Sequence, residues 1–570
     1  MKRISIYLLW LSVMLMVAFG CAKDNIVSVD PQEEDDADDY ISNTTFAHTV
    51  NVVFSTSGNA TVSETSSDFS VTIDGNDVTI EYSGEEYVMY NLSGTTTDGF
   101  FKLYSAKRQG ITLSDVSITN PNGAAINVQG PSSSPSGGKR TFVVVSGTNV
   151  LADGTSYTDT PSDEDEKAVL FGEGQLILSG DGSLTVNASG KSGITSDDYV
   201  RTMSSPSISI VSSAGHGIRG NDYVAISDGT LNIKVSANMK KGISSDGYVL
   251  VDGGTTTINI TGDAAYDDED QEYTGTAGIK ADQYFKINAG TLNITNSGSG
   301  GKGINSDGTG YFNGGTVSIT ASGSNYTTGS ISAKGIKFDG DLNFAGSAVT
   351  VNCSAHEAIE SKGTITISDG AVYAYSASDD AMNASGNFTI SDGYVCGYAT
   401  SNDGLDANGN FYVNGGVVYA IGASSPEVAI DANTEGGYTL YVQGGSLIAI
   451  GGLENNSTLT QSCYSASSWS SSTWYAMSAG STTIAFKTPS NGGTPLVVSA
   501  ESTPSLQSGV TASGGTSYFD GMLLVGCSVS GGSTVSLSSY SGGSGGGPGG
   551  GPGGGNSGGG PGGSGGGPGF

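Results

Sequence analysis

The feature that most constrains this chain is an apolar residue that returns in the same local setting ten times between Ile194 and Ile430. Most intervals are 23 to 25 residues long, and two are longer, at 36 and 32 residues. The ten anchors are Ile194, Ile218, Ile243, Ile279, Ile304, Ile336, Ile359, Met382, Leu405 and Ile430. A period of this length indicates stacked repeats, because one unit cannot bury its apolar face alone whereas a stack can.

Each repeat carries strand and turn signals at constant distances from its anchor. Apolar residues stand six and eight positions after the anchor, as at Val224 and Ile226, which predicts a short strand with two faces. A glycine follows, as in Asp228-Gly229, and permits the positive φ of a sharp corner. A second alternating run comes next. We therefore predict an all-β fold, a right-handed parallel β-helix with short strands; a β-propeller would need about twice this period.

Composition sets the expected boundaries. With 90 glycines and only 14% charged residues, the chain suits short strands and tight turns and leaves little room for helix. We expect the parallel β-helix at 46–452 and a C-terminal capping β segment at 453–540, because a terminal repeat must be covered. Residues 541–570 are almost pure Gly, Pro and Ser and predict a disordered tail. Scattered cysteines without metal-ligand spacing are expected to be buried small hydrophobes: Cys353, Cys396, Cys463 and Cys527.

The N-terminus predicts export. Two basic residues precede an apolar stretch from Ile4 to Val17, and a small residue directly precedes Cys21. This pattern indicates a lipoprotein signal peptide at 1–20 with lipid on Cys21, and the apolar run is short for a transmembrane anchor. An acidic flexible linker is expected at 21–45, and it resembles the segments that send Bacteroidetes-type lipoproteins to the surface. We therefore expect an outer-membrane lipoprotein of the cell envelope, exposed at the surface and monomeric.

The charge favours cation binding. A formal net charge of -33 excludes a nucleic-acid partner, which requires clustered Lys and Arg. Acidic residues flank four consecutive anchors from Ile359 to Ile430, and stacking at strand spacing would place them in columns of like charge. Calcium suits such carboxylate and amide oxygens better than zinc or copper does, while a solvated acidic ladder without an ion is the alternative. The candidate calcium ligands are Glu357, Glu360, Asp379, Asp380, Asn383, Asn402, Asp403, Asp406 and Asp431.

A family resemblance rests on three stretches: Asn149 to Gly154, Gly172 to Val186, and the Gly-Ile-x-x-Asp coils that begin at Gly193. Over roughly residues 100–450 the chain resembles the β-helical carbohydrate-binding domains of bacterial surface proteins, distant relatives of family 9 pectate lyases. The resemblance implies a lyase-like fold with calcium sites that binds cellulose or acidic plant polysaccharides. Asp403 and Asp406 match the paired Asp of the lyase-type calcium motif.

Catalysis is not expected. A calcium-dependent lyase needs a basic side chain near the ion to remove the proton alpha to the uronate carboxylate. No Lys or Arg occurs between Lys362 and Lys487, so the coils after Asp403 offer no base, and Lys337 and Lys362 are the nearby substitutes. A pectate-type lyase therefore stays the enzymatic alternative. A glycosidase with paired acids is weaker, because the acidic columns already explain the acid pairs.

Outward positions in the last coils predict a polysaccharide-binding face. Sugar rings stack on flat aromatic patches, and this patch would consist of Tyr373, Tyr375, Tyr398 and Tyr419 unless the C-terminal segment covers it. A stripe of lysines is expected either to bind uronates or to pair with a neighbouring column of Asp residues. It consists of Lys241, Lys280, Lys302, Lys334 and Lys337. Of these, Lys334 and Lys337 are the candidate sugar ligands. A second tyrosine column is expected to be corner packing: Tyr199, Tyr223, Tyr248 and Tyr284. The sequence thus predicts a non-catalytic, calcium-binding, polysaccharide-binding surface lipoprotein, with a structural surface protein or adhesin as the competing class.

Overall fold

The computed structural model describes residues 30–31, 36–64, 66–158, 160–161 and 164–541, so the predicted signal peptide, Cys21 and all but the first residue of the Gly-rich tail lie outside the described residues. Contacts divide the chain into two units, Met1–Glu34 and Asp35–Phe570, and the fold below is that of the second. Among its described residues, the regular structure is β-strand with three short 3-10 helices, η1 (Ala37–Asp39), η2 (Ile41–Asn43) and η3 (Thr434–Gly436). None of the described helices is long and apolar enough to cross a membrane.

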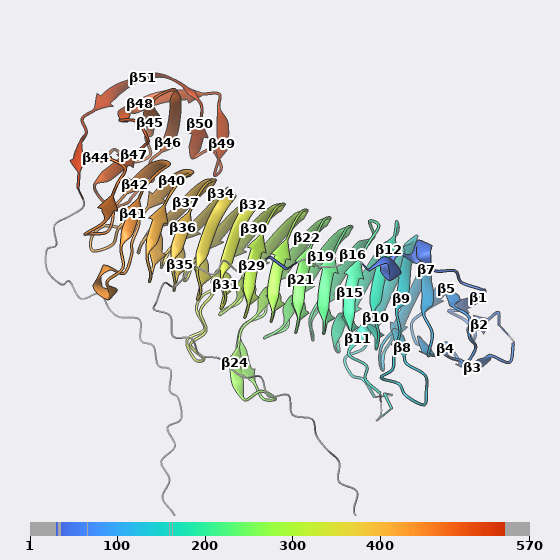
Figure 1. Cartoon of the computed structure of the whole chain (residues 1–570). Coiled ribbons are helices and arrows are strands. Elements are labelled where there is room, and N and C mark those ends of the chain that lie inside the picture. The colour runs from blue at the N-terminus through green and yellow to red at the C-terminus, as the bar shows by residue number, and fades with distance from the viewer. Residues whose placement is uncertain (1–29, 32–35, 65, 159, 162–163, 542–570) are drawn as a thin grey trace, which may run out of the picture. The chain divides into compact units, whose positions relative to one another are not determined.

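The anchors lie in a sheet of 14 strands, in which every strand from β4 onward pairs in parallel with the equivalent strand of the next repeat (Figure 1). This anchor row begins with an antiparallel pair, β3 and β4. Its strands are β3 (Phe69–Asp74), β4 (Asp77–Tyr82), β6 (Phe100–Ser105), β8 (Ile126–Gln129), β11 (Ala168–Gly172), β14 (Ser192–Ser196), β17 (Ile218–Gly220), β20 (Lys241–Ser245), β25 (Ala277–Ala281), β28 (Lys302–Ser306), β31 (Lys334–Phe338), β33 (Ile359–Ser361), β35 (Met382–Ala384) and β38 (Leu405–Ala407).

Two further rows of parallel strands belong to one 30-stranded sheet. The second row contains β9 (Thr141–Ser146), β12 (Leu176–Gly180), β15 (Tyr199–Thr202), β18 (Tyr223–Ile226), β21 (Tyr248–Val251), β26 (Tyr284–Ile287), β29 (Thr309–Phe312), β36 (Phe388–Ile390), β39 (Phe411–Val413), β41 (Leu440–Val442) and β43 (Thr458–Leu459). The third contains β10 (Thr148–Asp153), β13 (Ser183–Ala188), β16 (Ser207–Ser212), β19 (Thr230–Val235), β22 (Thr255–Ile260), β27 (Thr291–Asn296), β30 (Thr316–Ala321), β37 (Tyr394–Ala399), β40 (Val417–Ile421) and β42 (Ser446–Ile450). Long strands run through both rows at β5 (Val88–Thr96), β7 (Gln109–Asn120), β32 (Leu342–Cys353) and β34 (Ile365–Ser376), and β1 (His48–Phe54) with β2 (Thr61–Val62) starts the sheet.

The register confirms the predicted repeat. Ile194 pairs with Ile218 and Ile218 with Ile243, and the series continues through Leu405 to Ile430, each anchor having no exposed surface. Gly229 has the predicted positive φ of 99°, and a Cβ there would lie 2.6 Å from the Pro206 carbonyl oxygen. The four cysteines are buried and free, as expected. Because each buried residue covers its copy in the next repeat, the apolar core is continuous along the stack.

The two long intervals between anchors hold excursions from the stack. Between Ile243 and Ile279 the chain forms an antiparallel pair, β23 (Ala265–Asp267) and β24 (Glu272–Thr274). Between Ile304 and Ile336 an isolated antiparallel bridge joins Tyr326 to Ile331. The inserted residues therefore leave the parallel register on either side unchanged.

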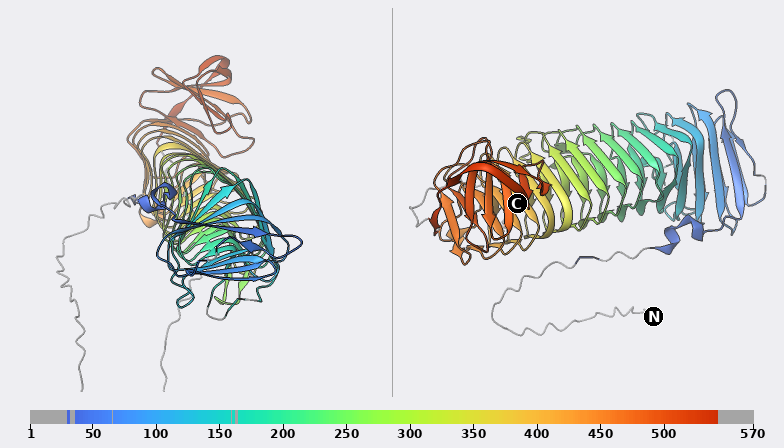
Figure 2. Two further views of the ribbon diagram at one scale, coloured as in Figure 1. Left: turned by 90° about the vertical axis from the view of Figure 1, so that its right-hand side faces the viewer. Right: turned by 90° about the horizontal axis from the view of Figure 1, so that it is seen from above.

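The segment after Leu453 is antiparallel. Strand β47 (Leu496–Ser499) pairs antiparallel with β42 and with β44 (Cys463–Ala466), which in turn pairs with β52 (Ser538–Tyr540). The remaining strands form a six-stranded sheet whose apolar side packs on the outer side of the last coils (Figures 1 and 2). They are β45 (Trp474–Ala479), β46 (Thr482–Lys487), β48 (Ser505–Ser513), β49 (Thr516–Tyr518), β50 (Leu523–Val525) and β51 (Ser528–Val535). We call this the C-terminal sheet.

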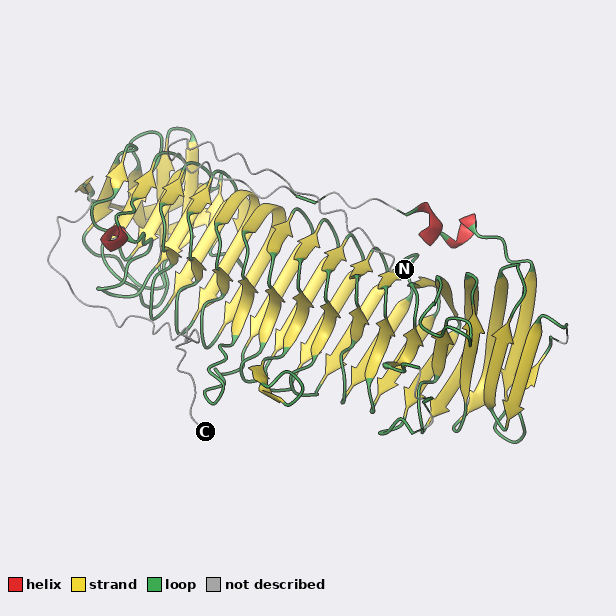
Figure 3. Ribbon diagram, turned by 60° about the horizontal axis from the view of Figure 1, so that its bottom comes forward, coloured by secondary structure: helices red, strands yellow, loops and turns green. Residues whose placement is uncertain are grey.

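The described end of the predicted linker is bound to the body, unlike the flexible segment that the sequence led us to expect. We call residues 36–46 the strap, and Figure 3 shows its helices η1 and η2 in red. Asp39 has only 1% of its surface exposed and lies 3.0 Å from Nε of Arg140 and 3.0 Å from Nη1 of Arg201. Ile41 packs on the buried apolar cluster beneath it. Ion pairs with arginine and apolar packing therefore hold this acidic segment on the body.

Candidate functional site

The acidic columns follow the register of the anchor row. Glu360 pairs with Asn383 and Asn383 with Asp406 as Cα partners in consecutive strands. The column that precedes the anchors is joined by backbone donors, since the amide N–H of Asp403 donates to Oδ1 of Asp380 at 3.1 Å. The predicted columns are therefore present, and their carboxylates differ in what surrounds them.

The coil of Ile359 is neutralised by lysine. Nζ of Lys334 lies 2.9 Å from a carboxylate oxygen of Glu357 and also contacts Glu360, which Lys362 contacts from the other side. Burial would raise the pKa of Glu360, but the two lysines lower it. Ammonium groups thus already compensate the charge of Glu357 and Glu360, which disfavours calcium at these two of the predicted ligands.

A histidine neutralises the next carboxylates. Nδ1 of His356 contacts Glu357 and lies 2.8 Å from Oδ2 of Asp379, which also accepts a hydrogen bond from Asn402 at 2.9 Å. Potential ligand atoms of His356, Glu357 and Asp379 lie within 4.8 Å of one another. Burial would lower the pKa of His356, but the two carboxylates raise it to about 9. Without a bound metal, the imidazole is therefore protonated at neutral pH, and this group forms an ion-paired cluster.

The following coils carry carboxylates without such compensation. In the part of the chain that the structure describes, no basic side chain forms an ion pair with Asp380, Asp403 or Asp406. Nδ2 of Asn383 donates to Oδ2 of Asp380 at 3.0 Å and to Oδ2 of Asp406 at 2.9 Å. Burial, reinforced by the neighbouring carboxylates, raises the pKa of Asp380 well above its usual range, that of Asp403 to about 8 and that of Asp406 to about 6.

Asp431 continues this region. Its carboxyl forms hydrogen bonds with those of Asp406 and Glu454, and burial together with the bond to Glu454 raises the pKa of Asp431. A hydrogen bond between two carboxyl groups needs a shared proton. Glu454 was not among the predicted site residues. It follows Leu453, which pairs with the last anchor Ile430, and this register places Glu454 in the Asp431 column.

These coils suit calcium in the kind of donor they offer. Asp380, Asn383, Asp403, Asp406 and Asp431 supply only oxygen ligands and an excess of negative charge in a largely buried region, which a hard cation prefers. Among the described residues, the carboxylates of Asp380, Asp403 and Asp406 do not converge within 4.8 Å as a group of three. The region therefore offers oxygen ligands of the kind that calcium prefers, and these ligands are spread along a column over several coils.

A second convergent acidic group was not predicted. Asp165, Glu173 and Asp197 bring carboxylate oxygens within 4.8 Å of one another, and Nζ of Lys167 lies 3.0 Å from Asp165 and 2.7 Å from Asp197. Burial and Asp197 raise the pKa of Glu173 to about 7. The acidic residues that precede Lys167 were a signal in the sequence, but the group has a lysine at its centre and is an ion-paired cluster.

The lysine stripe is largely ion-paired. Lys337 pairs with Asp339, and Lys280 lies 3.0 Å from Asp282. Lys334, predicted to bind sugar, is buried among carboxylates and does not present its charge to a glycan. Ion pairing, the alternative that the sequence left open, therefore describes most of this stripe.

The predicted aromatic face is covered. Tyr419 has no exposed surface, and its hydroxyl donates to the backbone carbonyl of Lys487 at 2.8 Å. Tyr373 packs on Phe519 with ring centroids 5.8 Å apart. The C-terminal segment thus covers Tyr373, Tyr419 and the half-buried Tyr398, so the predicted sugar platform is wrong at these three tyrosines. Tyr375 is half-buried and contacts Tyr398, and its role in sugar binding stays a prediction.

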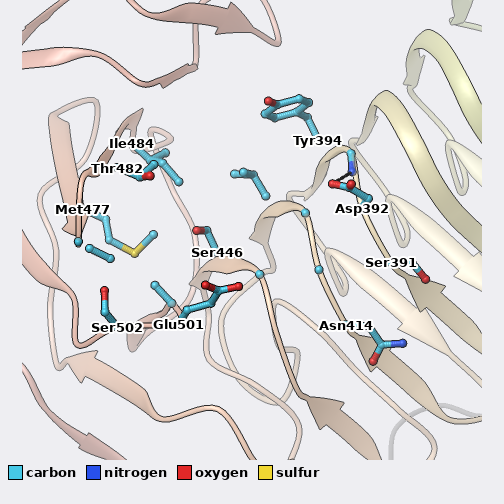
Figure 4. A pocket seen from close by; sticks show the side chains of 18 of the residues that line it. Ser391, Asp392, Tyr394, Asn414, Ser446, Met477, Thr482, Ile484, Glu501 and Ser502 are labelled. Carbon is cyan, nitrogen blue, oxygen red and sulfur yellow. Dashed lines mark hydrogen bonds between the residues drawn. The ribbon is translucent and has the colours of Figure 1, made fainter.

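A groove of about 720 Å³ remains where the last coils meet the C-terminal sheet (Figure 4). Asp392 and Tyr394 line it from one corner, Met477 lines it from β45 of the C-terminal sheet, and Glu501 lines it from the loop between β47 and β48. Tyr394 stacks on Tyr518 with ring centroids 3.7 Å apart. Its aromatic ring is therefore engaged within the protein.

Comparison with known families identifies the domain. Two matches to one family model, described as carbohydrate-binding domain-containing protein, span residues 74–329 and 232–381 and together cover more than half of the chain. The chain belongs to this family. The matched part of this carbohydrate-binding domain protein includes the coils from Ile194 to Ile359 and ends before Asp403.

Other comparisons add little. No curated protein matches the chain. Among solved structures, the gadolinium derivative of a polysaccharide lyase-like protein from C. thermocellum is 24% identical, with a match that covers 48% of this chain and 96% of that one. The TM-score of this match is 0.36.

Proposed function

We propose that this protein is a non-catalytic, calcium-binding lipoprotein that binds polysaccharide at the cell surface. The observation that carries polysaccharide binding is the family match, which spans the regular coils. The lipid anchor at Cys21 and the surface location rest on the sequence of the N-terminus. The partner is a polysaccharide of the cellulose or acidic plant type, with a site on the stack of coils.

The proposed fold is a right-handed parallel β-helix. Successive anchor strands are parallel members of one sheet, and each is reached from the last by a crossover through the other two rows. Parallel crossover connections are right-handed in about 98% of cases, because twisted strands pack back on their sheet in that sense. This chirality argument supports the handedness.

Calcium is the proposed ion of the uncompensated coils. It would be held by Asp380, Asn383, Asp403, Asp406 and Asp431, where burial without a basic partner raises the pKa of the carboxyl groups. A bound cation supplies the missing positive charge and links neighbouring coils. We leave Glu357 and Glu360 out of this set, because Lys334 neutralises them.

The lysine contacts favour binding over elimination chemistry. A lyase base must be deprotonated, yet Glu357 and Glu360 raise the pKa of Lys334 against the effect of burial. Lys362 contacts Glu360, and Lys337 contacts Asp339. Lys334, Lys337 and Lys362 are thus each engaged by a carboxylate.

A glycan array with added calcium, repeated in chelator, tests this proposal. We expect the full chain to be retained on plant-type polysaccharides in calcium. Retention on no glycan would overturn polysaccharide binding and favour the adhesin alternative. Release of unsaturated uronate products from polygalacturonate would instead establish a lyase and contradict the non-catalytic assignment.

A further inference from the structure

The tyrosine column expected to be corner packing forms a stacked ladder. Tyr199, Tyr223, Tyr248 and Tyr284 are Cα partners in β15, β18, β21 and β26. Their ring centroids are 4.2, 4.7 and 4.6 Å apart, and the planes of adjacent rings differ by 12°, 11° and 7°. Tyr311 meets the last ring edge-on at 6.3 Å. The rings cover one another's faces and leave their edges to line one continuous surface.

A groove of about 620 Å³ lies beside the first three rings of the ladder. Its lining also includes the polar side chains of Asn221, Asp222, Asp246 and Gln283, all from the same corner of successive repeats. Because its walls repeat from coil to coil, the groove follows the stack. It therefore suits an extended chain better than a compact molecule.

Several polar groups of the groove are available to a ligand. Within the described part of the chain, the side chains of Asn221, Asp222 and Gln283 form no hydrogen bond with other protein groups. Asp222 and Gln283 are exposed and Asn221 is half-buried. Carboxylate oxygens accept hydrogen bonds from sugar hydroxyls, and carboxamides both donate and accept them. An apolar wall of ring edges beside such groups is the lining expected of a sugar-binding groove.

The position of the groove agrees with the family match. Residues 199–284 lie within the matched span, whereas Tyr398 and Tyr419 of the predicted platform lie beyond its end. The C-terminal sheet covers that platform, and the ladder lies on earlier coils. The ladder is thus an aromatic surface of the matched domain that borders a groove.

The charge of the groove selects the class of glycan. Asp222 and Asp246 contribute carboxylates, and the Arg219 guanidinium lies 3.0 Å from Asp246 and is paired with it. A uronate polymer would bring further negative charge to this surface and be repelled. Uncharged pyranose rings meet no such cost.

We propose that this groove is the glycan site and that it binds a neutral, linear polysaccharide along the tyrosine ladder. This inference rests on the proposed function and adds the site and the substrate class. The strap stabilises the first ring, because the Tyr199 hydroxyl donates to Asp39 at 2.5 Å and accepts from Arg140 at 2.8 Å. The first ring of the row is thus held in place before the ligand binds, which lowers the entropy cost of binding.

Affinity electrophoresis of the full chain tests the inference, with hydroxyethylcellulose as the neutral probe and polygalacturonate as the acidic one. Two groove variants are compared with the parent, Tyr223→Ala/Tyr248→Ala and Asp222→Ala/Gln283→Ala. The matched control is Tyr412→Ala/Tyr441→Ala, which removes another stacked pair, with centroids 5.0 Å apart, on β39 and β41 outside the groove. The melting temperature of each variant verifies its fold, and the exposed Asp222/Gln283 pair gives a test that does not depend on ring packing.

We expect the parent to be retarded by hydroxyethylcellulose, both groove variants to bind roughly tenfold or more weakly, and the control to bind like the parent. Equal retardation of the parent and both groove variants would overturn the groove while leaving polysaccharide binding intact. Retardation of the parent by polygalacturonate alone would overturn the neutral class. If neither probe retards the parent, this inference fails, and the glycan array decides separately whether the proposed function fails with it.

Discussion

The coil of Ile359 and the two coils after it share the same columns but compensate their carboxylates differently. Lys334, Lys362 and His356 surround Glu357, Glu360 and Asp379, whereas no ion pair in the described residues reaches Asp380, Asp403 or Asp406. The pKa of Glu360 is lowered as a result, while that of Asp403 is raised to about 8. Basic side chains of the protein compensate the first group of carboxylates. An external cation would compensate the second group and so stabilise the fold.

The largest effect is expected at Lys334, which compensates the first of these regions. Replacing it by Met leaves Glu357 and Glu360 buried with less positive charge, and breaking a buried ion pair in this way costs about 3–5 kcal/mol. We expect Lys334→Met to lower the free energy of unfolding in urea by this amount, with or without calcium. A loss below about 1 kcal/mol would show that lysine does not stabilise this coil.

The second region should respond to calcium in a way that the first does not. Ions that bind only the folded state stabilise it by about 3 kcal/mol at a hundredfold excess over the dissociation constant. At the affinities of extracellular modules, about 0.1–1 mM, the gain is nearer 1 kcal/mol per site. We expect Asp403→Asn/Asp406→Asn to abolish the calcium-induced rise in melting temperature.

In chelator, the same double variant should match the parent or exceed it in stability, because repulsion between the empty carboxylates is relieved. The parent in chelator is the control. Equal calcium responses in the variant and the parent would remove the ion from this corner.

The two regions should also titrate with opposite signs. Asp406 and Asp403 have folded-state pKa values of about 6 and about 8, above the unfolded value of about 4. As the pH rises from the unfolded value through these folded values, the two residues destabilise the fold, because the folded state must then hold a buried negative charge. The lowered pKa of Glu360 instead gives stability that is present above its unfolded value and lost in acid.

In chelator we therefore expect the melting temperature to fall between pH 5 and pH 8.5, and calcium to reduce that fall by replacing the lost protons. Thermal melts across this range, with and without calcium, measure both slopes. Identical pH profiles in calcium and chelator would contradict the assignment of an ion to these carboxylates.

The smallest effect is expected at Lys337, which lies in the same strand as Lys334, three residues later. It pairs with Asp339 at a half-exposed site, and such pairs contribute about 0–1 kcal/mol. We expect Lys337→Met to change the free energy of unfolding by no more than this. A loss as large as that of Lys334→Met would mean that burial does not distinguish the two lysines.

Much of the fold could be predicted because its signals are local and repeated. The anchors from Ile194 to Leu405 and the corner at Gly229 are defined by spacing alone, and the register confirms them. Lys334 stands two residues before Ile336, as Glu357 does before Ile359, so the same count could have predicted their ion pair.

Other features depend on segments without a period. Residues beyond Leu453 break the repeat, and nothing in their order predicts that they cover Tyr419. The docking of Asp39 on Arg140 and Arg201 joins residues more than 100 positions apart, which spacing within a repeat cannot reveal. Contacts made by these non-repeating segments therefore determine which candidate site residues are buried and which remain exposed.

Calorimetric titration of calcium into the chelator-treated full chain at neutral pH tests the central claim most directly. We expect saturable binding with a dissociation constant of about 0.1–1 mM in the parent and in Lys337→Met, and no binding in Asp403→Asn/Asp406→Asn. Absence of binding in the parent, or unchanged binding in the double variant, would contradict the claim that calcium compensates these coils.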